Sequence, residues 1–235
     1  MNSTSPQQII FHPASSHMST RPSFQQELEA TAQHLATVLP PAANNTIDTG
    51  ITAVQSSGVA ERSLRAGQQA PNFTLPDAAG RPVMLSQLLA TGPVVLVFYR
   101  GNWCPYCNVQ LRAYSQALEK FRAHGATLLA VSPQTPELTR LTAEEKDLQF
   151  PVLSDARNAV ARQYGLPYQV GEAVYQTLHG VGIDLAAFNG DASGELPLTG
   201  TFVIGQDGRI AWAHVDANFK QRPDPALVLA ALAKL

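Results

Sequence analysis

The 235-residue sequence lacks several features that would direct it to a particular partner or compartment. It has no excess of basic residues, because 16 Lys and Arg stand against 18 Asp and Glu, and this gives no support to a nucleic-acid partner or an anionic membrane. No apolar run is long enough to span a bilayer. Residues 1–20 are rich in Ser, Gln, Thr and Pro and contain neither the basic nor the apolar segment of a secretory signal. We therefore expect a disordered leader over 1–20, a cytoplasmic location, and no nucleic-acid or membrane partner.

Cysteine is also scarce, and the chain holds its only two within Cys104-Pro105-Tyr106-Cys107. Residues 93–100 (PVVLVFYR) form an apolar run that predicts a buried strand before the pair. After the pair, apolar side chains recur at helical spacing, at Leu111, Tyr114, Leu118 and Phe121. The cysteines are thus expected at the first turn of a helix, where free N–H groups and the helix dipole favour a thiolate. This placement indicates redox chemistry.

Zinc binding is the main alternative use of a CxxC motif. A structural zinc site needs four ligands, but there is no second CxxC and the six histidines are scattered along the chain. A close CxxC also fits a cytosolic redox motif better than a structural disulfide. We expect neither a metal nor another cofactor.

The remaining pattern divides the chain into an N-terminal extension and an α/β body. Ser23 and Gln26 form a capping box before a helical pattern that ends at Pro40-Pro41, and 42–65 resemble a linker with at most one weak helix. Residues 66–235 alternate strands and helices and end in a hairpin through Asp207-Gly208 and a helix begun by Asp224-Pro225. Residues 166–196 show no clear period and are expected to be an insertion. This order predicts a central mixed β-sheet flanked by helices, a thioredoxin-like fold.

Several separate segments resemble one family. They are 67–75 (GQQAPNFTL), 98–107 (FYRGNWCPYC), 131–136 (VSPQTP), 150–155 (FPVLSD) and 201–204 (TFVI) with the following Asp207-Gly208. Together they are similar to the bacterial peroxiredoxin-like family, the alkyl hydroperoxide reductase/thiol-specific antioxidant proteins of the thioredoxin-fold superfamily. The resemblance covers roughly 60–235, and it implies a thioredoxin-like peroxiredoxin domain at 66–235.

The active-site segment combines two patterns. The peroxiredoxin pattern Pro-x-x-x-Thr/Ser-x-x-Cys places Cys107 at the peroxidatic position, with Cys104 where Thr is usual and Arg100 where Pro is usual. A second Arg, usual before the Phe of the penultimate strand, is replaced by Thr199. In the thioredoxin and glutaredoxin pattern, Trp103 precedes a dithiol in which the more exposed Cys104 attacks and Cys107 resolves. The sequence leaves open which cysteine attacks a peroxide.

Arg100 and Trp103, beside the cysteines, each have two interpretations. Arg100 either stabilises a thiolate or peroxide oxygen or extends to solvent from the strand end. Trp103 either covers the cysteines or is a packing residue, and Thr199 is a candidate wall of the substrate groove. The segment around Arg222 is expected to cap a loop rather than line the site. The insertion at 166–196 is expected to form a lid, a dimer contact or a small core of its own.

The resemblance implies a thiol peroxidase that reduces hydrogen peroxide or organic hydroperoxides through a Cys104/Cys107 dithiol–disulfide cycle. Thioredoxin or glutathione with glutaredoxin would then reduce the disulfide, and a homodimer is the expected assembly. One alternative is a thioredoxin-like thiol–disulfide oxidoreductase that acts on disulfide substrates. Another is a redox-sensing module without catalysis, which predicts a slow reaction with peroxide.

Overall fold

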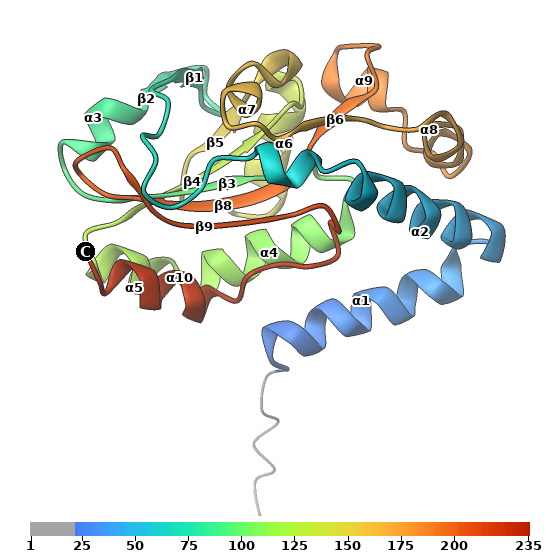
Figure 1. The fold of residues 1–235 in the computed structure, drawn as a ribbon, viewed down its shortest axis with the longest axis horizontal. Coiled ribbons are helices and arrows are strands. Elements are labelled where there is room, and N and C mark those ends of the chain that lie inside the picture. Colours follow the sequence, from blue (N-terminus) through green and yellow to red (C-terminus); the bar gives the residue numbers. More distant parts are fainter. Residues whose placement is uncertain (1–21) are drawn as a thin grey trace, which may run out of the picture.

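A mixed five-stranded sheet forms the centre of the computed structural model, which describes residues 22–235 (Figure 1). The leader expected at 1–20 lies outside the described residues. The strands lie side by side in the order β5 (Val152–Ser154), β4 (Thr127–Ser132), β3 (Val94–Phe98), β8 (Thr199–Ile204) and β9 (Ile210–Asp216). β3, β4 and β5 are parallel, whereas β8 is antiparallel to both β3 and β9. This is the mixed sheet that the sequence predicts for a thioredoxin-like fold.

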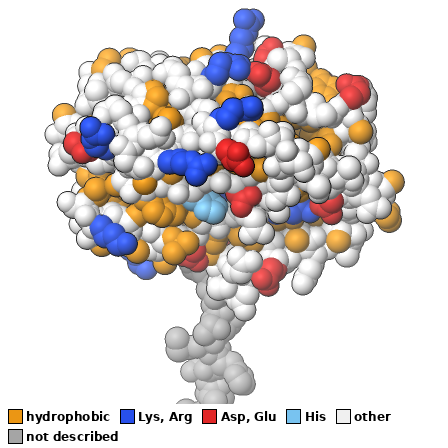
Figure 2. Space-filling model, viewed as in Figure 1, with side chains coloured by type: hydrophobic (Ala, Val, Ile, Leu, Met, Phe, Trp, Pro, Cys, Tyr) orange, Lys and Arg blue, Asp and Glu red, His pale blue; other side chains and the backbone are white. Residues whose placement is uncertain are grey.

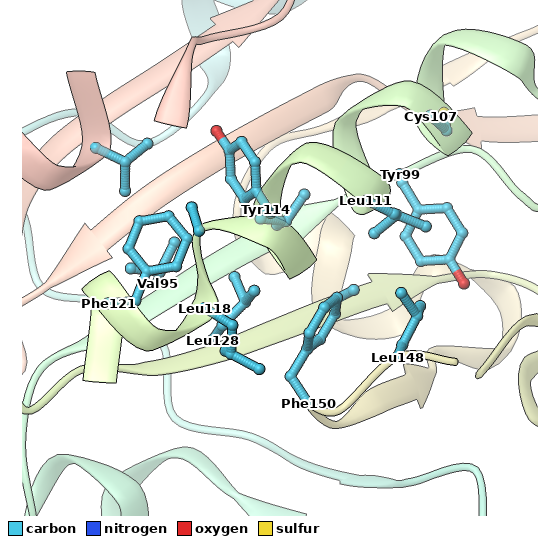
Figure 3. Close-up of a cluster of buried hydrophobic side chains, with 14 of the residues drawn as sticks. Val95, Tyr99, Cys107, Leu111, Tyr114, Leu118, Phe121, Leu128, Leu148 and Phe150 are labelled. Atoms are coloured by element: carbon cyan, nitrogen blue, oxygen red, sulfur yellow. The ribbon is translucent and has the colours of Figure 1, made fainter. Parts of the chain in front are cut away.

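Helices cover both faces of the sheet, so β3 is buried along its whole length. In Figure 1, α4 (Pro105–Gln116), α5 (Leu118–Ala123) and α10 (Pro225–Leu232) lie below the sheet, and α3 (Leu85–Leu89) and α7 (Ala159–Gln163) lie above it. Val95, labelled in Figure 3, and Val97 pack in the core cluster with residues of α4 and α5, whereas Val94 and Leu96 pack in the cluster on the opposite face. Burial on both faces explains why this strand is a continuous apolar run.

The other elements of the body lie around this sheet. α6 (Pro136–Glu145) packs beside β5, and η2 (Ala156–Asn158) leads into α7. The expected hairpin forms a separate small sheet of β1 (Thr74–Pro76) and β2 (Pro82–Met84). The single helix expected at 105–123 is instead α4 and α5, because Ala117 between them leaves the helical conformation.

The N-terminal extension contains two helices. α1 (Phe24–Val38) begins with the predicted capping box of Ser23 and Gln26. The segment expected to be a linker with one weak helix is more helical than predicted, because α2 (Pro41–Ser56) is sixteen residues long and η1 (Val59–Arg62) comes after it. Pro41 occupies the first helical position, where a missing N–H costs nothing, so the Pro-Pro pair begins a helix as well as ending one.

The expected insertion at 166–196 has its own small core. β6 (Pro167–Gln169) pairs with β7 (Glu195–Pro197), and α8 (Glu172–Gly180) and α9 (Leu185–Asn189) lie between them in sequence. Val170, Leu178, Leu185 and Leu196 are buried together. Of the alternatives for this segment, a core of its own is therefore confirmed. α2 packs against α8, as Figure 1 shows.

The surface carries no large field of one sign on the face drawn in Figure 2, where acidic, basic and apolar side chains are interspersed. Across 22–235, none of the helices is both long enough and apolar enough to cross a bilayer.

Candidate active site

Both cysteines lie at the start of α4, as the sequence predicts. Cys104 is the N-cap residue, Pro105 occupies the first helical position, and Cys107 follows in the first turn. Both are free thiols. The sequence predicts Cys104 as the more exposed of the two cysteines, but both are buried, with an exposure of 1% for Cys104 and 0% for Cys107. Helices α1 and α2, which the sequence pattern did not place near the site, provide part of this cover.

Arg100 lies beside Cys104 and does not extend to solvent. Its exposure is 3%, and its Nη1 atom is 3.9 Å from the Cys104 Sγ. The guanidinium carbon lies 4.7 Å from the centre of the Trp103 ring and 3.8 Å from that of Phe219. Trp103 therefore packs on the arginine next to the cysteines. Planar stacking of this kind holds an arginine in place without neutralising its charge.

A second arginine reaches the site from the opposite end of the chain. Nη2 of Arg222 donates to the Cys107 Sγ at 3.3 Å, and Nη1 donates to the Thr199 hydroxyl. The expectation that the segment around Arg222 only caps a loop is therefore wrong. Thr199 is buried and fixes this arginine, and it is not among the residues that line the cavity beside Cys104.

Neither of these buried arginines forms an ion pair with a carboxylate in the part of the chain described here. A buried charge without a partner is strongly unfavourable. Each arginine has one of the two sulfur atoms within reach of its guanidinium, so a thiolate is the negative charge that the surroundings favour. The pair of arginines thus selects for one ionised cysteine.

The two thiols respond in opposite directions. Burial raises the pKa of the Cys104 thiol, but a hydrogen bond from the Cys107 thiol and the charges of Arg100 and Arg222 outweigh it and lower this pKa to about 5. Burial, together with the hydrogen bond and the charge of Cys104, raises the pKa of Cys107 well above its ordinary value. The pair therefore carries one negative charge at neutral pH, on Cys104. The Cys107 thiol remains protonated and donates to it.

The loop before the cysteines is held by Gln134. The Asn102 backbone N–H donates to the Gln134 Oε1 at 2.5 Å, and the Asn108 side chain donates to the Asn102 carbonyl at 2.8 Å. Gln134 is fully buried and also donates to Thr142. Because Asn102 lies between Arg100 and Cys104, this contact fixes the path of the loop that joins them.

Cys104 lies at the side of a cavity of about 360 Å³. Its walls come from α1, α2, α8 and the segment before α10, in addition to the loop that holds Trp103. Most of the lining side chains are apolar. Within 22–235, no three His, Cys, Asp or Glu side chains gather in an arrangement that could hold a metal ion.

The fold and this pair of buried cysteines define a thioredoxin-fold protein with a dithiol at the start of a helix. Residues 66–213 match the AhpC/TSA family. The chain belongs to that family.

Two curated relatives are similar to part of the chain. The chain is 38% identical over 101 residues to a chloroplastic peroxiredoxin Q of Sedum lineare. The matched segment is 43% of this chain and 54% of that protein. The chain is 34% identical over 112 residues to a chloroplastic peroxiredoxin Q of Triticum aestivum, covering 48% and 51%. The match thus spans about half the length of these relatives. Their names place them in chloroplasts, and the cytoplasmic location expected for this chain stays a prediction.

Two solved structures share the fold. Peroxidoxin BcpB from Mycobacterium tuberculosis has a TM-score of 0.58 at 24% identity and covers 73% of this chain and 98% of its own. Peroxiredoxin Q of Xanthomonas campestris has a TM-score of 0.54 at 20% identity and covers 69% and 90%. The two-helix extension, α1 and α2, lies outside the segment that matches the family.

Proposed function

We propose that this protein reduces a hydroperoxide through a Cys104/Cys107 dithiol–disulfide cycle. The observation that carries the proposal is a buried Cys104 with a lowered pKa, beside two arginines that have no carboxylate partner, at the side of a cavity. Membership of the AhpC/TSA family supports the same reaction class. Thioredoxin, or glutathione with glutaredoxin, is the proposed reductant.

The first step is attack by the Cys104 thiolate on the terminal oxygen of ROOH. The sulfur–oxygen bond forms as the oxygen–oxygen bond breaks, and the alkoxide leaves and takes up a proton to become ROH. Cys104 is then a sulfenic acid. Arg100, 3.9 Å from the sulfur, is placed to stabilise the negative charge as it moves from sulfur to oxygen.

The second step closes the cycle within the motif. Cys107 loses its proton and attacks the sulfenic sulfur, a Cys104–Cys107 disulfide forms, and hydroxide leaves and is protonated to water. Two thiols of the reductant then supply two electrons and two protons and restore both cysteines. Arg222 contacts the Cys107 Sγ, so its charge favours the thiolate that this step needs.

The geometry favours Cys104 over Cys107 as the attacking residue. Cys104 lines the cavity, whereas Cys107 does not and its pKa is raised. The same geometry favours a small hydroperoxide over a protein disulfide as the first reactant of the reduced protein, since Cys104 is buried at the side of a cavity of about 360 Å³. General thiol–disulfide exchange is therefore the second candidate.

The test is the second-order rate of thiol loss when reduced protein meets hydrogen peroxide or cumene hydroperoxide, with free cysteine at equal thiolate concentration as the reference. We expect a rate orders of magnitude above the reference. Cys104→Ser should abolish the fast phase, whereas Cys107→Ser should keep it and accumulate a sulfenic acid that dimedone traps. The reverse assignment would make Cys107 the attacking residue, and rates near the reference for both peroxides would exclude a peroxidase.

A further inference from the structure

The N-terminal extension supplies walls to the cavity that holds the reactive sulfur. We propose that α1 and α2 form a binding site for the uncharged, apolar body of an organic hydroperoxide and so set substrate preference. This inference rests on the proposed peroxidase function. It concerns residues 24–56, which precede the family segment at 66–213.

The walls of the cavity are apolar on two sides. Leu35 of α1, Leu39 just after it and Ile47 of α2 line it from the extension, and Leu178 of α8 and Val181 just after it line it from the insertion. Cys104 and Trp103 complete the lining near the helix α4. An apolar ligand in this cavity would thus place its reactive end near the sulfur and its body between the extension and the insertion.

The size of the cavity suits a substrate much larger than hydrogen peroxide. Its volume of about 360 Å³ exceeds twice the roughly 150 Å³ of an engineered apolar cavity that binds benzene. Ligand sites for small organic molecules begin at about 300 Å³. Hydrogen peroxide has no apolar surface, so it gains nothing from these walls.

The charges that line the cavity are already engaged. Asp48 of α2 and Lys220 form an ion pair with each other, and the Arg100 guanidinium stacks on aromatic rings beside Cys104. No other charged side chain lines the cavity. Asp48 and Lys220 neutralise each other and the Arg100 charge faces the Cys104 sulfur, so the part of the cavity away from the sulfur offers no unpaired charge to a carboxylate or amine on the ligand body, and we therefore infer an uncharged body.

Several contacts hold the extension in place over the site. Leu28 of α1 is buried in the core beneath α4, and Arg112 of α4 pairs with Glu27 at 2.6 Å. On α2, Gly50 allows close approach to α8, because a Cβ there would lie 2.4 Å from the Val174 Cγ2. The apolar walls are thus part of the folded structure around Cys104.

The first test measures binding without catalysis. Calorimetry would follow 2-phenyl-2-propanol, the alcohol that cumene hydroperoxide yields, added to the Cys104→Ser protein. We expect saturable binding that weakens in the Leu35→Ala and Ile47→Ala variants of that protein, because each buried methylene contributes roughly fourfold to binding. Gln33→Ala, an exposed change on α1 outside the cavity lining, should leave binding unchanged. Absence of saturable binding overturns the inference.

The second test compares kcat/KM for cumene hydroperoxide and hydrogen peroxide in proteins that keep both cysteines. Leu35→Ala and Ile47→Ala should lower the cumene hydroperoxide value roughly tenfold and leave the hydrogen peroxide value unchanged. Ala36→Trp, which fills the cavity from α1, should lower kcat/KM for cumene hydroperoxide further and leave that for hydrogen peroxide unchanged. Circular dichroism and a denaturant unfolding curve report independently whether each variant is folded.

The two proposals fail in different ways. Fast reaction with hydrogen peroxide together with no selective loss for cumene hydroperoxide overturns the role of the extension and leaves the peroxidase standing. Rates near that of free cysteine for both peroxides overturn the proposed peroxidase function, whether or not 2-phenyl-2-propanol binds. Parallel losses for both peroxides in the folded variants also overturn the inference.

Discussion

Arg222 Nη2 lies 3.3 Å from the Cys107 Sγ although the two residues are 115 positions apart. The Thr199 hydroxyl accepts from the same guanidinium. Thr199 stands where the family resemblance places a second arginine on the penultimate strand. Arg222, in the segment before α10, therefore supplies the positive charge that this strand lacks, and Thr199 holds its guanidinium by a hydrogen bond.

Removing this charge should slow the reaction with peroxide. For Arg222→Met we expect a rate at neutral pH lower by roughly 10- to 150-fold, the equivalent of one hydrogen bond to a charged group. The rate of Arg222→Lys should lie between those of the native protein and Arg222→Met, because a lysine keeps the charge but not both hydrogen bonds. Stopped-flow kinetics and the thiolate absorbance titration provide the measurement. Arg122→Met, at an exposed surface pair, is the matched control, and an unaltered titration in Arg222→Met would contradict this role.

The rate should depend on pH through Cys104. The thiolate is the reactive form and the pKa of Cys104 is about 5, so we expect the rate to fall as pH drops through about 5 and to be flat around neutrality. Free cysteine, with a pKa of about 8.5, would still be rising there. A pH–rate profile of Cys107→Ser, in which one thiol remains, checks whether the low inflection needs the partner thiol. An inflection near 8 or above in the native protein would contradict the assignment.

The lowered pKa of Cys104 also predicts how the free energy of unfolding changes with pH. The folded pKa of Cys104 lies below the unfolded value, so its contribution is fully present above the unfolded pKa and is lost as pH falls toward about 5. Urea unfolding of the reduced protein should therefore show a loss of stability over this range that Cys104→Ser lacks. Equal pH dependence in both proteins would contradict it.

Gly50 should matter for packing rather than for helix formation. Gly→Ala within a helix normally stabilises by about 1 kcal/mol, but the new Cβ would lie 2.4 Å from the Val174 Cγ2. We expect Gly50→Ala to destabilise the protein by about 1–3 kcal/mol through overpacking. In a Val174→Ala background the same change should become stabilising. Denaturant unfolding of the four proteins in the cycle measures this reversal, and equal effects in both backgrounds would show that α2 and α8 do not press together here.

Gln134 should act on the cysteines through the loop. Gln134→Leu removes the acceptor for the Asn102 N–H, and leaving a buried donor unpaired costs about 1–3 kcal/mol. We expect that loss in unfolding experiments together with a higher Cys104 pKa, because the loop would no longer hold Arg100 in place. Thr142→Val, which removes the other partner of the Gln134 side chain, is the control. It should reduce stability without moving the thiolate titration.

The sequence predicted the parts of the fold that depend on local pattern. Apolar runs marked the central strands because both faces are buried, and Ser23 with Gln26 marked the start of α1 through a local hydrogen-bond pair. The place of Cys104 and Cys107 at a helix start follows from the same local logic. The family to which the chain belongs could also be recognised from short segments.

The missed parts depend on contacts between distant segments. Arg222 lies in a stretch without a helical or strand period, where the sequence predicted only loop capping. α2 holds Asn44, Asn45 and Thr46, poor helix formers, and it is held by packing on α8. The walls that α1 and α2 provide to the cavity beside Cys104 followed from neither propensity nor spacing, so the sequence did not predict a covered site.

The buried arginine pair also has a consequence for the oxidised protein. When Cys104 and Cys107 join, the thiolate disappears and Arg100 and Arg222 lose the negative group that faces them. The reduced state is thus favoured by the same charges that activate the sulfur, which makes a disulfide a stronger oxidant. By the thermodynamic cycle that links folding to oxidation, forming this disulfide should make the folded chain less stable, the opposite of what a cross-link usually does.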